Sequence, residues 1–390
     1  MKKTTIKAAA AVVLAAVMIL PLGCVGPQTA DSTASNPLSS DTMKANVFTD
    51  MLRLIPATEN TTNTVYVQDY SRLPEEYRLF PPPSPLPEGY PIMQNNRFWN
   101  LAHYDPQEWK NHMGFNQEDM AQEAFAWRMV PMDMYEVVRG NFDKDVIENA
   151  LKSDPINDDL VTLRYAGLEY FSAGEDGMSL QKRSQIRPLG QALRLAVLDN
   201  TLLSTSSTLS MQNLLDVYQK NIESLADLEA FRQLAEGMER LDAMAAIFSS
   251  ESQAQSSFKE RFKEIIENPG QNSGSRLRRN LAEQVQRNVL LQPYEALAVG
   301  FGTDDKGEYM AVVLVNPDES TAKANASLLE RQIRSSNFDE GKSWAELVTS
   351  IETTQDGDLV LAKLYGEAAN RWKAFDSAML GGDPLLMYGG

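Results

Sequence analysis

Residues 135–151 have the sequence YEVVRGNFDKDVIENAL, and residues 310–329 have the sequence MAVVLVNPDESTAKANASLL. Each stretch begins with a run of β-branched and apolar residues, continues through an Asn-x-Asp turn, and ends in a segment whose apolar residues recur with helical spacing. Both stretches therefore predict a strand, a turn and a helix. The two share their order and turn chemistry more than their identity, so they indicate a weak internal repeat, which coincidence would explain equally well.

Pairs of predicted strands surround these two stretches, and turn residues separate the strands of each pair. The predicted pairs are residues 160–165 with 168–171, 193–198 with 202–204, 296–301 with 309–315, and 347–353 with 359–364. The strand-rich parts, about 130–220 and 294–380, each carry helices with an apolar stripe wide enough to cover one sheet face. We therefore expect an α+β protein with two small antiparallel-sheet and helix units, of ferredoxin-like or related type, joined by a helical segment.

The connecting segment is expected to be helical because its apolar residues keep a 3.6-residue spacing from Ser224 to about Val289, apart from a break at NPGQNSGS, residues 268–275. Residues 25–43 are rich in Ser, Thr, Pro and Gly, which favours a flexible tether. The expected organisation is a signal peptide at 1–23, a tether at 24–43, an N-terminal α+β domain at 44–223, a helical connecting segment at 224–292 and a C-terminal α+β domain at 293–390.

The N-terminus carries a targeting pattern. Lysines at positions 2, 3 and 7 precede an uncharged apolar run at residues 8–20, which is too short to cross a bilayer and has the length of a signal-peptide core. The run ends in LPLGC at residues 20–24, and Cys24 is the only cysteine of the chain. This arrangement resembles the lipobox of bacterial lipoproteins, although Pro21 stands where leucine is commonest. An ordinary secreted protein with a chance cysteine is the alternative.

The lipobox resemblance implies that the peptide is cut before Cys24 and that this cysteine is diacylated, with palmitate as one expected lipid. The protein would then lie in the cell envelope, anchored on the extracytoplasmic side of a bacterial membrane. An acylated Cys24 would leave no thiol for catalysis or for a disulfide, so the body must be stabilised by an ordinary hydrophobic core.

Charge and composition narrow the possible partners. The chain is 43% hydrophobic and 23% charged, which is typical of a globular protein. Its formal charge is −17, and taking away the three lysines of the predicted signal peptide leaves −20. Such a surface repels phosphate backbones, so we expect no nucleic-acid partner.

Candidate metal and acid–base residues are few. His103 and His112 lie in HYDPQEWKNH with Asp105 and Glu108 between them, but their nine-residue separation does not place both on one helix face, and Pro106 interrupts the stretch. We therefore expect no metal site and interpret both histidines as surface or capping residues. The acidic pairs Asp158/Asp159, Asp304/Asp305 and Asp356/Asp358 are interpreted as solvent-facing or turn residues.

No motif for a cofactor or a nucleophile is present. The chain has no G-x-S-x-G elbow, P-loop or G-x-G-x-x-G sequence. A ligand groove is expected between the two sheet units, because small-molecule sites often lie where two domains meet. Its candidate walls are the basic cluster Arg276, Arg278, Arg279 and Arg287 and the Met- and Trp-rich residues 98–135; a solvated face and core packing are the respective alternatives.

Three stretches of the body add a second resemblance. LRLIPA (residues 52–57), VYVQDY (65–70) and YEALAVGFG (294–302) resemble packing motifs of bacterial lipoproteins of unknown function. This resemblance implies no catalytic residue. We expect a non-enzymatic, membrane-tethered lipoprotein without a cofactor that binds an unidentified protein or small molecule. A membrane-anchored hydrolase with a site of scattered carboxylates and serines is the alternative.

Overall fold

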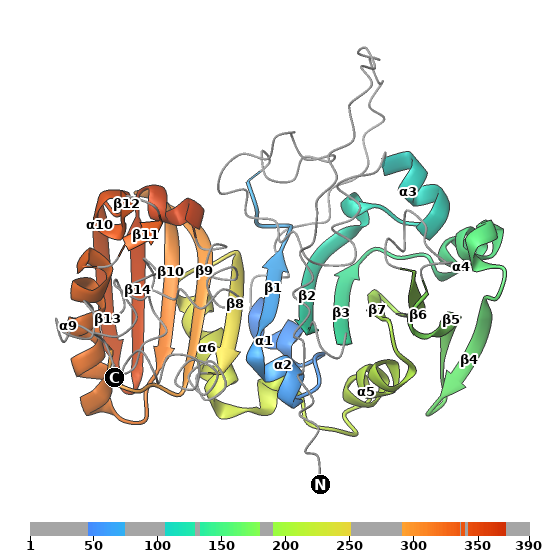
Figure 1. Cartoon of the computed structure of the whole chain (residues 1–390), viewed down its shortest axis with the longest axis horizontal. Helices are drawn as coiled ribbons and strands as arrows, with labels where there is room; N and C mark the ends of the chain where they lie inside the picture. Colours follow the sequence, from blue (N-terminus) through green and yellow to red (C-terminus); the bar gives the residue numbers. More distant parts are fainter. Residues whose placement is uncertain are drawn as a thin grey trace, which may run out of the picture. The chain divides into compact units, whose positions relative to one another are not determined.

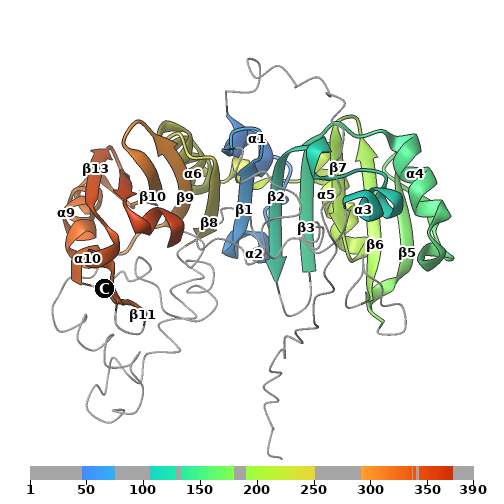
Figure 2. The same cartoon turned by 90° about the horizontal axis from the view of Figure 1, so that it is seen from above.

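Among the described residues, twelve antiparallel strands form one sheet in the computed structural model of this chain (Figure 1). The structure describes residues 46–74, 106–128, 133–179, 190–250, 291–335, 337–339 and 342–371. The strands follow one another across the sheet in the order β13-β14-β10-β9-β8-β1-β2-β3-β7-β6-β5-β4. Figure 2 shows β8 and β1 next to each other in the middle of this row.

The strands of the large sheet are β1 (Val65–Asp69), β2 (Met120–Arg128), β3 (Asp133–Gly140), β4 (Val161–Tyr165), β5 (Leu168–Met178), β6 (Gln191–Leu198), β7 (Thr201–Thr205), β8 (Ala245–Ser250), β9 (Ala296–Asp304), β10 (Gly307–Val315), β13 (Ser350–Asp356) and β14 (Leu359–Tyr365). A separate pair consists of β11 (Asn337–Asp339) and β12 (Lys342–Ser343).

The α-helices are α1 (Val47–Leu52), α2 (Glu59–Asn63), α3 (Pro106–Met113), α4 (Lys144–Ser153), α5 (Thr208–Tyr218), α6 (Glu229–Arg240), α9 (Glu319–Ser335) and α10 (Trp344–Leu347). Short 3-10 helices are η3 (Gln117–Asp119), η4 (Pro155–Asn157), η6 (Leu225–Asp227) and η7 (Glu367–Arg371). None of the described helices has the length and apolar character needed to span a membrane.

The local predictions from the two strand–turn–helix stretches are confirmed. In the first stretch β3 leads into α4, and the Asp143 carboxylate caps that helix by accepting hydrogen bonds from the backbone N–H groups of Asp145 and Val146, at 2.9 and 3.2 Å. In the second, β10 leads into α9, and Asp318 accepts from the backbone N–H of Thr321 at 2.7 Å. The four predicted strand pairs are also present, as β4–β5, β6–β7, β9–β10 and β13–β14.

The predicted fold class, two small ferredoxin-like units joined by a helical segment, was wrong. A single sheet spans both strand-rich parts because β8 lies within the expected helical segment and pairs with β1 on one side and β9 on the other. The short apolar run AAIFSS of β8 has no periodicity that separates a buried strand from a helix. Its pairing with β1 joins residues 65–68 to 245–248, and local sequence patterns carry no record of such distant pairing.

Both faces of the inner strands are apolar and buried. Helices α1, α5 and α6 pack on one face, where Val67, Ala246 and Val313 belong to one core cluster. Helices α9 and α10 pack on the other face, where Phe125, Ile247 and other alternate strand residues form a second cluster. Polar side chains on the inner strands are therefore enclosed in protein.

Candidate functional site

A row of buried polar side chains crosses the middle strands on the face that carries α9 and α10. Its members, which we call the central polar row, are Gln68 of β1, Glu123 of β2, Glu136 of β3 and Ser204 of β7. Their exposed fractions are 1%, 3%, 0% and 0%. Two carboxyl groups, an amide and a hydroxyl in the core of a sheet are unusual, because buried polar groups are costly unless they are hydrogen-bonded.

The strand register places these four side chains on one face. Gln68 lies directly opposite Glu123, and Glu136 lies directly opposite Ser204. Glu123 is opposite Val138, two residues along β3 from Glu136, so the two glutamates are diagonal neighbours. Side chains directly opposite each other have Cβ atoms about 5 Å apart, and diagonal neighbours are within reach of long side chains.

Gln68 is the most informative member of the row. Neither its amide nitrogen nor its amide oxygen has a hydrogen-bond partner in the part of the chain that the structure describes. On β8 it is opposite Ala245, whose side chain has no polar group. An unsatisfied buried polar group costs about 1–3 kcal/mol of stability. Such a group calls for an explanation, and a bound water, ion or ligand is among the usual ones.

The surroundings of Gln68 combine polar and aromatic groups. The Tyr70 hydroxyl donates a hydrogen bond to Oε2 of Glu123, which fixes one of the carboxylate oxygens next to the amide. On the same face the rings of Tyr66 and Phe125 lie with their centroids 6.2 Å apart. The Gln68 amide therefore offers one donor group and one acceptor beside a carboxylate and an aromatic pair.

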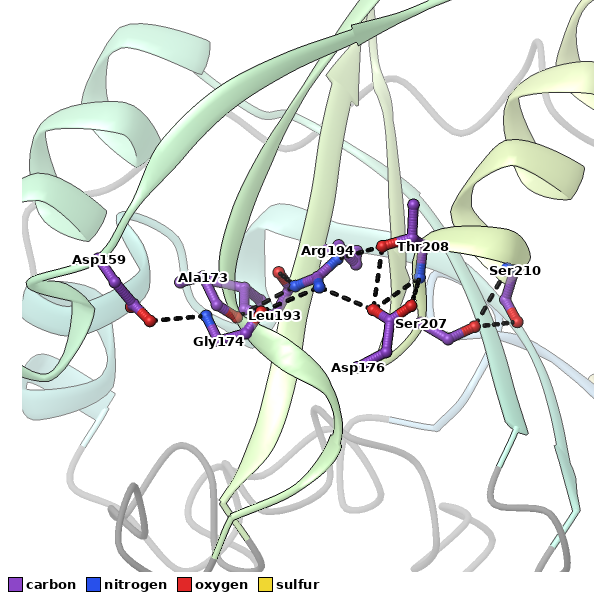
Figure 3. A network of polar contacts seen from close by, with 9 residues as sticks. All are labelled: Asp159, Ala173, Gly174, Asp176, Leu193, Arg194, Ser207, Thr208 and Ser210. Atoms are coloured by element: carbon purple, nitrogen blue, oxygen red, sulfur yellow. Dashed lines mark hydrogen bonds and ion pairs between the residues drawn. The ribbon is translucent and has the colours of Figure 1, made fainter.

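A second polar cluster is centred on Arg194 of β6 (Figure 3). Only 5% of this side chain is exposed, and its guanidinium makes five hydrogen bonds. It donates to the carbonyl oxygens of Ala173, Gly174 and Leu193, to the Thr208 hydroxyl and to the Asp176 carboxylate, over distances of 2.7–3.2 Å. Since arginine has five N–H donors, every donor is used and none remains for a ligand.

The Arg194 cluster explains two features of the local fold. Residues 173–178 of β5 depart from regular register with β6, and Arg194 holds the carbonyl groups of this irregularity. Figure 3 shows Asp176 between Arg194 and the start of α5, where it accepts from the backbone N–H of Thr208 at 2.9 Å. Ser207 caps the same helix by accepting from the N–H of Ser210 at 3.1 Å. We therefore interpret this cluster as structural.

The histidine region is only partly described. His112 Nδ1 lies 2.9 Å from Oδ2 of Asp154, the residue that follows α4, so its partner comes from another element and not from its own segment. His103 and Asp105 lie outside the described residues, and nothing is described of the Glu108 side chain. Among the described residues there is no group of three or more His, Cys, Asp or Glu side chains arranged to hold a metal ion.

The acidic pairs lie in turns or on the surface, as predicted. One of these residues, Asp304, also accepts hydrogen bonds from three donors. Asp304 accepts hydrogen bonds from the backbone N–H of Lys306 at 3.0 Å, from Lys363 at 2.7 Å and from the Tyr365 hydroxyl at 2.9 Å. Burial alone would raise the pKa of Asp304, but these hydrogen bonds together hold it below its ordinary value. Asp356 forms an ion pair with Arg240 at 2.9 Å, and Asp158 and Asp159 are exposed.

The predicted location of the ligand groove was wrong. It was placed between two separate sheet units, and the strands of both belong to one sheet. Of its candidate walls, the arginines at 276, 278, 279 and 287 lie outside the described residues. In the Met- and Trp-rich stretch, the described Trp109, Met113 and Met120 are 2%, 2% and 6% exposed and belong to the core, which is the packing alternative.

Sequence reasoning missed the central polar row, although a signal for it was present. VYVQDY, AQEAFAW and YEVVR each carry Gln or Glu within a run that otherwise has the pattern of a buried strand. A polar residue at a core position of a strand is more informative than an acidic residue in a turn, because burial makes it costly. Cys24, the predicted lipidation site, lies outside the described residues.

No protein-family model matches the chain, and no curated protein matches it. Among solved structures, crystal form III of TP0453 is similar with a TM-score of 0.40 and 7% identity over 84% of this chain and 98% of the other. Crystal form I of TP0453 gives 0.39 and 9% over 84% and 97%. Likeness at this level supports no inference about function.

Proposed function

We propose that this protein is a membrane-tethered, extracytoplasmic lipoprotein that binds a small polar ligand at the central polar row and does not transform it. The observation that carries the binding proposal is the buried amide of Gln68, for which the described part of the chain supplies no hydrogen-bond partner. The tether is proposed from the signal-peptide pattern and Cys24.

The proposed tether has a simple physical basis. One acyl chain gives only reversible membrane binding, whereas two chains, at about 0.8 kcal/mol for each buried methylene, hold a protein stably. A diacylated Cys24 followed by the Ser-, Thr- and Pro-rich residues 25–43 would allow the folded body to stand away from the lipid headgroups.

The chemistry of the row narrows the class of ligand. The Gln68 amide can donate to one ligand atom and accept from another, and hydroxyl, amide and amine groups offer such atoms. Two neighbouring carboxyl groups, Glu123 and Glu136, disfavour an anionic ligand by repulsion whenever they are ionised. The proposed ligand is therefore neutral or cationic, for example a polyol, an amide or a primary amine.

Lipidation can be tested in a bacterial host with a clickable fatty acid. The wild-type chain should incorporate the label and fractionate with membranes, and Cys24→Ala should lose the label and keep its signal peptide. Ser35→Ala, a substitution of similar size within the predicted tether, is the matched control and should label normally. Equal label on the wild type and on Cys24→Ala would contradict the proposed tether.

Ligand binding can be tested by thermal unfolding of the full chain carrying Cys24→Ala. A panel of polyols, amides, primary amines and carboxylates should contain neutral or cationic compounds that raise the Tm, whereas the carboxylates should not. The added variant Gln68→Met should abolish the shift, and Gln332→Met, at another buried glutamine, should retain it. A shift that persists in Gln68→Met, or a panel without any shift, would contradict the proposed site.

The hydrolase alternative is favoured by one specific observation. Ser204 lies directly opposite Glu136 in the register of β3 and β7, which places a hydroxyl-bearing residue beside a potential base. A fluorophosphonate probe that labels the wild type but not Ser204→Ala would support a serine hydrolase and overturn the proposal of binding without chemistry.

A further inference from the structure

The edge strand β4 has an unusual exposed surface. It is the last strand in the sheet order, so its outer side has no partner among the described strands (Figure 1). Its first four residues are all exposed, including Val161 and Leu163 with exposed fractions of 50% and 39%. An open edge presents a row of backbone N–H and C=O groups that can pair with another strand.

The opposite edge of the sheet, strand β13, differs from β4 because charged side chains protect it against pairing with another strand. Strand β13 carries Glu352, paired with Lys306, and Asp356, paired with Arg240. Charged side chains on an edge strand discourage pairing with another chain. In β4, with the sequence VTLRY, Arg164 is the only charged residue.

The sequence of β4 is complementary to itself. If two copies of the strand pair in antiparallel fashion about Leu163, then Leu163 lies opposite its own copy, Val161 lies opposite Tyr165 and Thr162 lies opposite Arg164. This register places no like charges opposite each other. Val161, Leu163 and Tyr165 alternate along the strand and share one face, so the apolar side chains of the two copies would adjoin.

We propose that β4 is the interface through which two copies of this chain associate, so that the sheet continues across a two-fold axis. The contact is isologous, with the same surface used by both copies. Main-chain hydrogen bonds between the two strands and burial of Val161 and Leu163 stabilise it. The association does not depend on the ligand proposed for the central polar row.

Cysteine cross-linking provides a direct test. The full chain with Cys24→Ala has no cysteine, so adding Leu163→Cys creates a single thiol that lies next to its own copy at the two-fold axis. Mild oxidation should give a disulfide-linked dimer on a non-reducing gel. The matched control is Thr353→Cys at the middle of β13, an exposed position on the protected edge, which should remain monomeric. Equal cross-linking of the two variants would overturn the proposal.

Sedimentation analysis tests the same interface without a cross-link. The Cys24→Ala chain should show a concentration-dependent dimer, and adding Leu163→Lys should raise its dissociation constant at least about tenfold, because like charges would then lie directly opposite each other. Circular dichroism establishes that this exposed substitution leaves the fold intact. A chain that is monomeric at every concentration, or a dimer unaffected by Leu163→Lys, would overturn the proposal.

Discussion

Gln68 and Gln332 are both buried in the described part of this protein, and the surroundings of their amide groups differ. Gln332 of α9 accepts a hydrogen bond from the buried backbone N–H of Leu291 at 3.0 Å. Gln68 of β1 has an amide with no partner among the described residues. Folding alone explains the buried Gln332 side chain, because it provides a hydrogen-bond acceptor for the backbone N–H of Leu291, shortly before β9. Folding alone does not explain the buried Gln68 amide, and for this reason we place the proposed binding site at Gln68.

The comparison extends to the larger polar clusters. Near Gln332, Asn325 donates to Asn316 Oδ1 at 2.7 Å and to the Gln292 carbonyl at 3.0 Å, so this region is a connected network. The Arg194 cluster is equally complete, because all five guanidinium donors are used. Completed networks stabilise the fold, and an incomplete one costs stability unless another molecule completes it. Four substitutions test this distinction.

The largest effect is expected at Arg194. Arg194→Met should lower the free energy of unfolding by about 3 kcal/mol, because it leaves buried carbonyl oxygens and the Asp176 carboxylate without their charged donor. Urea denaturation measures this change. Lys110→Met, at an exposed position, is the control and should change the stability by less than about 0.5 kcal/mol. A loss at Arg194 no larger than that of the control would contradict the structural role of the cluster.

A smaller loss is expected at Gln332. Gln332→Met should lower the free energy of unfolding by about 2 kcal/mol, because the N–H of Leu291 would stay buried without its acceptor. The same urea denaturation series provides the measurement. An unchanged stability would mean that the hydrogen bond contributes little and would weaken the comparison with Gln68.

At Gln68, by contrast, the substitution is expected to increase the stability of the protein. In the absence of ligand, Gln68→Met should raise the free energy of unfolding by about 1 kcal/mol, because an apolar side chain of similar shape removes the cost of an unsatisfied buried amide. Measured beside Gln332→Met, it compares the same chemical change at two buried positions. Destabilisation by Gln68→Met would show that the amide is satisfied within the protein, and the proposed binding site would then be lost.

The smallest effect is expected at Asp304, another carboxylate with a full set of donors. Since its pKa is lower in the folded protein, its contribution is present above the ordinary value of 3.8 and is lost as the pH falls through the folded-state pKa. Asp304→Asn should cost less than about 1 kcal/mol at neutral pH, because this ion pair is partly solvated. Urea denaturation from pH 7 to pH 3 should show a shallower loss for the variant; parallel curves would contradict the role of the carboxylate.

Neighbouring residues were enough to predict the local parts of this molecule. Asp143 and Asp318 stand where a strand gives way to a helix, and both cap the predicted helix, because a cap involves only residues close in the chain. The hairpin of β6 and β7 could be predicted for the same reason. It turns at Asp199, which has the left-handed conformation at φ 50°. The predicted tether at Cys24 is likewise a property of adjacent residues and stays a prediction.

How these parts join, and where the polar groups meet, could be learned only from the folded chain. Pairing of β1 with β8 merged two expected units into one sheet, and it brings together residues about 180 positions apart. The same pairing encloses Gln68, while β2, β3 and β7 bring Glu123, Glu136 and Ser204 onto its face. Each strand segment shows a polar residue within an apolar run, but not which polar residues of other strands lie beside it. Their burial and their proximity arise from strand register across the sheet, which local propensity and periodicity do not encode.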